Sequence, residues 1–168
     1  CGLRTDGSLK CWGNMSSPSE GTYVDISCTE NACCGVRDDE SMGCWGSSNY
    51  GQLNSPLGNY VSVDGAYRHF CALTIAGDVK CWGENNKGQT TVPQTNDVYS
   101  QVSLGNYHSC ALRESDGYVN CWGQWDNNST NNQDNSGPYK SLSGGGNYFH
   151  CGLLYGGRYR CWGDNSQF

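Results

Sequence analysis

Residues 71–83, CALTIAGDVKCWG, hold the pattern that decides the fold of this 168-residue chain. The triplet Cys-Trp-Gly that ends this stretch occurs five times, and each copy closes a segment that begins with another cysteine. Successive copies are 33, 37, 40 and 40 residues apart. A period of this length is typical of propellers and solenoids. The chain is therefore predicted to be an array of one repeated unit, with its tryptophans at Trp12, Trp45, Trp82, Trp122 and Trp162.

An antiparallel hairpin accounts for the spacing within each unit. When residues 71–81 fold back about Ala76, Cys71 comes opposite Cys81, and Leu73 comes opposite Val79. Side chains alternate along a strand, so both pairs share one face and the two sulfurs meet. In one unit an extra residue falls in the turn at 114–117, so the cysteines still face each other. The predicted disulfides are Cys1–Cys11, Cys34–Cys44, Cys71–Cys81, Cys110–Cys121 and Cys151–Cys161.

The number of cysteines indicates in which cellular compartment the protein folds. Ten of the twelve cysteines pair within hairpins, and the remaining two, Cys28 and Cys33, are close enough in sequence to pair with each other. A chain with every cysteine paired is typical of an oxidising environment, which predicts an extracellular protein, secreted or on the cell surface. Zinc is the alternative role for so many cysteines, but it favours Cys-x-x-Cys spacing, which does not occur here. We therefore expect no metal and no cofactor.

Tyrosine-led segments rich in β-forming residues lie between the hairpins. Examples are YVSVDGA at residues 60–66 and YSQVSL at residues 99–104. Each is predicted to be a strand that precedes the next hairpin, because aromatic and β-branched residues favour strands. The chain is then a single repeat array, either complete or part of a longer chain, with units at residues 1–33, 34–70, 71–109, 110–150 and 151–168.

The full repeat resembles that of the regulator-of-chromosome-condensation family, in the cysteine-paired form of its secreted members. One unit carries the family pattern at Gly105, His108, Cys110, Ala111, Leu112, Gly117, Val119, Cys121, Trp122 and Gly123. Another carries it at Cys71, Ala72, Leu73, Gly77, Val79, Cys81, Trp82, Gly83, Asn85, Gly88 and Gln89. The resemblance implies an all-β fold, a propeller or partial propeller of about five blades around a central channel. The second repeat departs from the pattern, with Ser48 where asparagine is expected.

Composition argues against several functions. The net charge is −6 and no basic cluster is present, so we expect no nucleic-acid partner. The chain contains no nucleophile motif and no phosphate-binding glycine loop, so we do not expect an enzyme. No apolar run is long enough to span a bilayer, so we expect no membrane insertion.

Histidines occupy the same place in three repeats, just before the hairpin, at His69, His108 and His150. One interpretation is that each ring bonds neighbouring backbone and shapes its blade. The other is a ring of ligands that lines the channel. We favour the first, because the last histidine is offset by one residue from the other two.

Polar loops follow each Cys-Trp-Gly triplet and hold the candidate contact residues. Trp125 lies outside the repeat in a long polar loop, where an aromatic residue is a candidate for ligand or partner contact. Asn85 and Asn165 follow a tryptophan closely, as in many sugar-binding sites. The sequons at Asn14, Asn127 and Asn128 predict N-glycosylation.

Two functions from different classes remain open. The first is an extracellular structural or protein-interaction module, a subunit of a filament or surface assembly whose partners are other proteins or copies of itself. The alternative is a lectin-like or enzyme-inhibitor propeller, with glycans among its partners. The hairpin at residues 1–11 has no strand before it, and exposed strand edges attract other strands. We expect either a longer chain or a head-to-tail contact near residues 161–168, which builds a fibre if it does not close.

Overall fold

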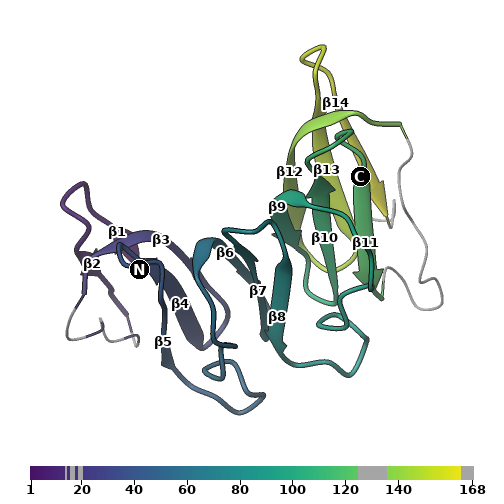
Figure 1. Ribbon diagram of the computed structural model, residues 1–168. Helices are drawn as coiled ribbons and strands as arrows, with labels where there is room; N and C mark the ends of the chain where they lie inside the picture. Colours follow the sequence, from purple (N-terminus) through teal and green to yellow (C-terminus); the bar gives the residue numbers. More distant parts are fainter. Residues whose placement is uncertain (14, 16–17, 19–20, 125–135, 164–168) are drawn as a thin grey trace.

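The structure is a computed structural model that describes residues 1–13, 15, 18, 21–124 and 136–163. These residues form fourteen strands in five antiparallel sheets, without a helix in the described part of the chain. The sheets follow one another in chain order along an arc (Figure 1). They are β1 (Gly2–Leu3) with β2 (Leu9–Lys10); β3 (Tyr23–Cys28), β4 (Ala32–Arg37) and β5 (Met42–Gly46); β6 (Tyr60–Ala66), β7 (His69–Thr74) and β8 (Val79–Gly83); β9 (Tyr99–Leu104), β10 (His108–Arg113) and β11 (Val119–Gly123); and β12 (Tyr139–Gly145), β13 (Phe149–Leu154) and β14 (Tyr159–Gly163).

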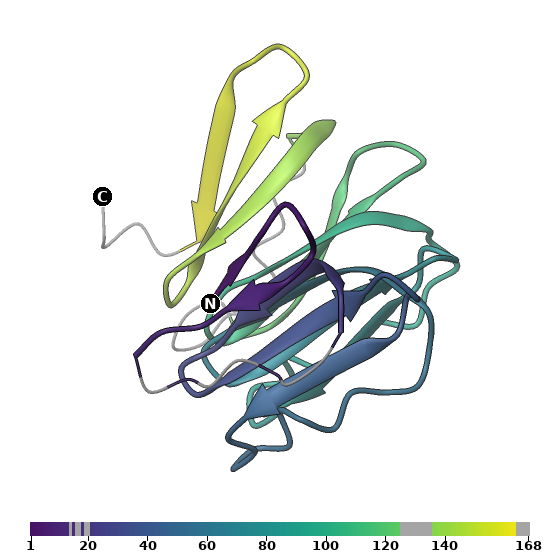
Figure 2. The same cartoon turned by 90° about the vertical axis from the view of Figure 1, so that its left-hand side faces the viewer.

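The sheets are propeller blades, as the sequence predicts. Four have three strands, in the order inner strand, middle strand and outer strand, and the first has two strands among the described residues. The inner strands β3, β6, β9 and β12 contact one another in sequence. Seen from the N-terminal side, the two-stranded sheet lies in front of the sheet β3–β5 (Figure 2). The chain is thus an all-β partial propeller built from stapled hairpins.

The register within the hairpins agrees with the spacing argument. Cys71 lies opposite Cys81 and Leu73 lies opposite Val79. The longer hairpin keeps Cys110 opposite Cys121, because its extra residue is taken up in the turn. The structure joins the same six pairs that the sequence predicts: Cys1–Cys11, Cys28–Cys33, Cys34–Cys44, Cys71–Cys81, Cys110–Cys121 and Cys151–Cys161.

The hairpin turns need one residue in the left-handed region. Gly77 takes this role in β7–β8, with a φ of 81°. The hairpin β4–β5 has no glycine in its turn, and Glu40 adopts a φ of 69° there. Side chains other than glycine disfavour this conformation because the Cβ crowds the backbone. The turn at Glu40 is therefore locally strained.

We expect the substitution Glu40→Gly to raise the free energy of unfolding by about 0.5–1 kcal/mol, because glycine tolerates positive φ. Urea denaturation measures the change. The matched control is Glu114→Gly, in the turn of β10–β11, where φ is not positive. Glycine there only loosens the unfolded chain, so stability should stay equal or fall. Equal gains from both substitutions would contradict the strain at Glu40.

Side chains of each inner strand bridge to the backbone of the next one. The Asp25 carboxylate accepts a hydrogen bond from Val63 N at 2.8 Å, and Asp64 accepts one from Leu104 N at 2.9 Å. Gln101 bonds both the N–H and the carbonyl of Leu142, each at 2.8 Å. These amides lie on the edge of their sheets, where no further strand pairs with them. The bridges satisfy buried backbone groups and fix the angle between blades.

The substitution Asp64→Ala is expected to lower the free energy of unfolding by roughly 1–3 kcal/mol, because it leaves Leu104 N without an acceptor. Ser62→Ala is the matched control, since Ser62 lies two residues earlier on the same strand and makes no such bridge among the described residues. We expect a change within about 0.5 kcal/mol there. Chemical denaturation of the two variants compares them. Equal losses would show that the bridge contributes nothing.

Blades pack through two different faces. The disulfide face carries the cysteine pair of the hairpin and the apolar pair beside it. The tryptophan face carries the Cys-Trp-Gly indole and apolar residues of the inner strand. In each of the three core clusters, the disulfide face of one blade contacts the tryptophan face of the next. One such cluster joins Cys110, Leu112, Val119 and Cys121 to Tyr139, Leu142 and Trp162.

The loop after each triplet completes this contact. The indole N–H of Trp82 donates to the carbonyl of Gln52 at 2.8 Å, and that of Trp122 donates to Gln89 at 2.9 Å. Each glutamine lies in the loop of the preceding blade, where its side chain accepts a backbone N–H two residues earlier. The Gly-Gln end of the motif therefore positions a carbonyl for the next tryptophan.

Candidate functional site

The disulfide face of the last sheet, β12–β14, is open. Leu153 is 37% exposed and Tyr159 is 78% exposed there. The equivalent residues of the sheet before it, Leu112 and Val119, are each 4% exposed because the next blade covers them. No described residue covers the face at β13 and β14. An apolar surface of a kind that is elsewhere buried is thus available for contact.

The tryptophan face of the first hairpin is open as well. Trp12 is 66% exposed, whereas Trp82, Trp122 and Trp162 are 6–8% exposed. Trp12 therefore does not share the buried position of these three repeat tryptophans. Its indole differs because no described blade precedes β1–β2. The described chain exposes one face of each kind, and these two kinds of face are the partners in the three core clusters between blades.

A second exposed feature is a row of tyrosines at one end of the blades. Tyr67, Tyr107 and Tyr148 lie in equivalent turns between inner and middle strands. The rings of Tyr67 and Tyr107 are 5.4 Å apart between centroids, and those of Tyr107 and Tyr148 are 5.6 Å apart. All three are partly exposed. We call these residues the tyrosine row.

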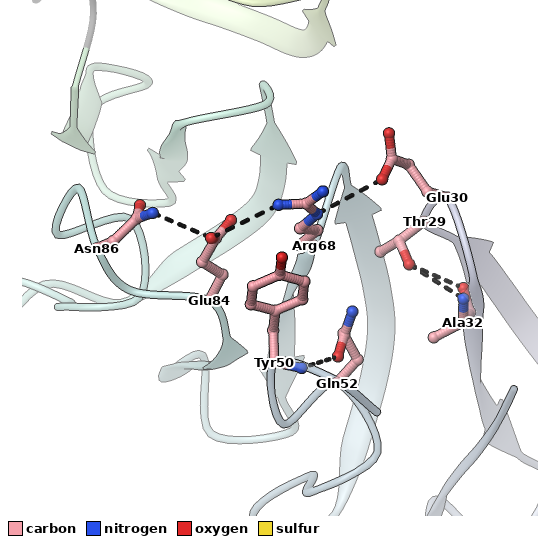
Figure 3. A network of polar contacts seen from close by, with 8 residues as sticks. All are labelled: Thr29, Glu30, Ala32, Tyr50, Gln52, Arg68, Glu84 and Asn86. Atoms are coloured by element: carbon pink, nitrogen blue, oxygen red, sulfur yellow. Dashed lines mark hydrogen bonds and ion pairs between the residues drawn. The ribbon is translucent and has the colours of Figure 1, made fainter. Parts of the chain in front are cut away.

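Arg68 follows Tyr67 of the tyrosine row in the chain and links two blades. Figure 3 shows its side chain between Glu30 and Glu84. Its guanidinium lies 4.4 Å from the ring centroid of Tyr50 and 4.3 Å from that of Tyr67. It also pairs with Glu30 at 3.5 Å and with Glu84 at 3.9 Å. The acidic and aromatic partners raise the pKa of Arg68 against the effect of desolvation. This cluster was not predicted from the sequence, although a tyrosine within two residues before each histidine was a visible signal.

The histidines form hydrogen bonds between blades. His69 Nε2 lies 2.9 Å from Ser109 Oγ, and His108 Nε2 lies 2.7 Å from His150 Nδ1. His150 Nε2 donates to the carbonyl of Ser103 at 3.0 Å. All three rings are fully buried, and burial lowers the pKa of His69 and of His150 to about 4. This arrangement agrees with the packing interpretation, in which the rings shape the blades.

A polar pocket of about 380 Å³ lies along the inner strands. Its carboxylates are Asp25 and Asp64, and burial raises the pKa of each, partly opposed by the backbone hydrogen bonds described above. Both carboxylates already accept hydrogen bonds from the next blade. The polar lining of the pocket is therefore explained by the packing of the inner strands.

The predicted contact and modification residues are only partly placed. Asn85 is exposed, but its amide bonds Thr90 N and the Thr91 hydroxyl, both at 3.0 Å, within its own loop. A ligand role for Asn85 stays a prediction. The other predicted residues lie outside the described part of the chain: Trp125, Asn165, and the sequon residues Asn14, Asn127 and Asn128.

Two further properties bear on the chemistry of the surface. The sulfurs of Cys1, Cys28 and Cys33 lie together, but each belongs to a disulfide and offers no thiolate to a metal. The described residues form no helix that is long and apolar enough to cross a bilayer.

Comparison with known proteins defines the class of the chain as a repeat propeller. Residues 61–89 and 99–133 match the family model of the Regulator of chromosome condensation (RCC1) repeat. These two segments carry RCC1 repeats in a cysteine-paired form, and the resemblance drawn from the sequence is confirmed. No curated protein matches the chain by sequence.

Solved propellers have the same fold. The CRINKLY WD40 ectodomain of the Arabidopsis thaliana receptor kinase ACR4 aligns with a TM-score of 0.73 and 24% identity over 86% of this chain and 51% of that chain. The ectodomain of the Physcomitrella patens receptor kinase CR4 aligns with a TM-score of 0.68 and 25% identity over 88% of this chain and 43% of that chain. Prp20p from Saccharomyces cerevisiae aligns with a TM-score of 0.72 and 17% identity over 88% of this chain and 46% of that chain. The chain therefore spans about half the length of these structures.

Proposed function

We propose that this chain is an extracellular protein-interaction module that assembles head to tail through its two open blade faces. The observation that carries the proposal is the exposure of Trp12 at one end and of Leu153 and Tyr159 at the other. Large apolar side chains in the equivalent positions are buried or partly buried in the three core clusters between blades. In a second copy of the chain, the open disulfide face can contact the open tryptophan face of the first copy, which is the pairing seen between blades.

The internal interfaces indicate what the contact would contain. A tryptophan face lies against a disulfide face, and a backbone carbonyl receives the indole N–H. Such a contact between copies is heterologous, because the two surfaces differ. A heterologous contact gives a ring when the rotation closes and a filament when it does not. This geometry supports a filament or surface coat.

The test is the size of the protein as a function of concentration, measured by sedimentation velocity with electron microscopy of the same samples. We expect oligomers that grow with concentration, and loss of these oligomers in Tyr159→Asp, which places a charge on the disulfide face. Leu57→Asp is the matched control, because Leu57 is 95% exposed in a loop away from both faces. A monomer at all concentrations would contradict the proposal. A further blade on a longer polypeptide would cover the same faces, and the mass of the particle distinguishes that case.

The extracellular location is proposed from the complete pairing of twelve cysteines. Two of the similar structures are receptor ectodomains. N-glycosylation at Asn14 and at Asn127 or Asn128 belongs to the same proposal. The intact mass of native protein before and after treatment with an N-glycosidase measures it. An unchanged mass would remove glycosylation from the proposal.

A lectin-like or inhibitor propeller is the alternative function. Of the residues predicted for it, Asn85 uses its amide inside its own loop, and the others lie outside the described part of the chain. A glycan array on dispersed protein tests this alternative. Binding of one glycan class by monomers would favour it over assembly.

A further inference from the structure

The tyrosine row lies apart from the open faces and has properties of its own. Its three rings come from consecutive blades and form a continuous aromatic strip. Asn106 and Asn147, beside Tyr107 and Tyr148, join the turns of two blades through a side-chain hydrogen bond of 2.6 Å. The backbone bond from Asn106 N to the carbonyl of Gly146 holds the same turns together. The strip is therefore rigidly supported.

Tyr67 is held in a strained conformation. Its φ is 49°, in the left-handed region that glycine and asparagine favour. The equivalent turn of the last sheet uses a glycine, Gly146, with a φ of 56°. Backbone strain of this kind collects at functional sites. The strain at Tyr67 places an aromatic ring at the end of the strip and over Arg68.

The charge beside the strip is negative and incompletely paired. Glu30 and Glu84 face a single cation, Arg68, which leaves one negative charge in excess. The Glu84 side chain is 8% exposed, and its Oε2 has no hydrogen-bond partner among the described residues. A buried carboxylate oxygen without a donor is costly. A ligand that brings a donor would remove this cost.

We propose that the tyrosine row and Glu84 form a binding site for a cationic side chain, a lysine or arginine, of a partner protein. Aromatic faces attract cations, and the excess carboxylate charge adds to this attraction. Arg68 shows the same chemistry within the chain, because it lies between two tyrosine rings and two carboxylates. Tyrosine is also among the residues that carry most of the affinity at protein interfaces.

The experiment measures binding of an acetylated and amidated hexalysine peptide to the intact protein by calorimetry. We expect affinity to fall at least tenfold in Tyr148→Ala and in Tyr67→Gly. The second substitution relieves backbone strain but also removes ring contacts, so a urea unfolding curve of each variant separates a loss of binding from unfolding. Tyr155→Ala is the matched control, because Tyr155 is 69% exposed in the β13–β14 turn, outside the row.

The outcomes separate this site from non-specific attraction and from assembly. The net charge of −6 attracts any polycation, but that effect is equal in all the tyrosine variants. Equal affinity of every variant for hexalysine would overturn the proposal, as would equal binding of a hexaglutamate peptide. The row does not belong to either open face, so sedimentation of the same variants should match the unaltered protein whatever the binding result.

Discussion

Complete reduction of the six disulfides is expected to unfold the protein. Each closed hairpin loop of about ten residues contributes roughly 2.5–3 kcal/mol in the chain-entropy picture, and a whole domain has a stability of about 5–15 kcal/mol. The apolar clusters that remain are small and include the cysteines themselves. They cannot replace the loss. Folding therefore depends more on the disulfides than on a large hydrophobic core.

Near-ultraviolet circular dichroism and tryptophan fluorescence measure this unfolding during titration with a phosphine reductant. The control is alkylation without reduction, which should change nothing because every cysteine is paired. Peptide mapping of unreduced protein determines the pairs directly. A native spectrum after complete reduction would contradict the prediction, and a bridge between two different hairpins would contradict the pairing.

Acidification is expected to destabilise the protein well before its carboxylates titrate. The folded state keeps His69 and His150 neutral, with pKa values of about 4 against 6.5 for the free side chain. The pKa of His108 is also lowered, by burial and by the nearby His150. Because the unfolded chain binds these protons first, the free energy of unfolding falls as pH drops from about 6.5 towards 4.

The expected loss between pH 7 and pH 5 is roughly 1–2 kcal/mol per histidine. Asp25 and Asp64 act in the opposite direction, because their raised pKa values favour proton uptake by the folded state. Urea unfolding at several pH values measures the slope. His150→Gln should give a shallower slope, even where it lowers stability at pH 7. A flat profile for the unaltered protein would show that the histidines are not buried in neutral form.

Features that repeat along the chain could be predicted from the sequence. The step from Cys71 to Cys81 determines the register of one hairpin, and its repetition determines the blade. These are local relations, in which alternation along a strand is enough. The pairing of Leu112 with Val119 in the longer hairpin follows from the same rule.

Features that depend on the rotation between blades could not be predicted. In the sequence, Asp25 and Asp64 look like ordinary polar residues of strands. Only the angle between the inner strands places each carboxylate beside a backbone amide of the next blade. The tyrosine row arises in the same way, from turns about 40 residues apart in sequence. The exposure of Trp12 could not be predicted either, because a repeat pattern treats all copies as equivalent.

The central claim is that an exposed tryptophan face pairs with an exposed disulfide face of another copy, and a mixing experiment tests it most directly. Trp12→Asp removes the first face and Tyr159→Asp removes the second, so each variant keeps one functional face. Sedimentation velocity should show each variant alone as a monomer and their equimolar mixture as a one-to-one dimer. A mixture that stays monomeric, or a variant that dimerises with itself, would contradict head-to-tail assembly.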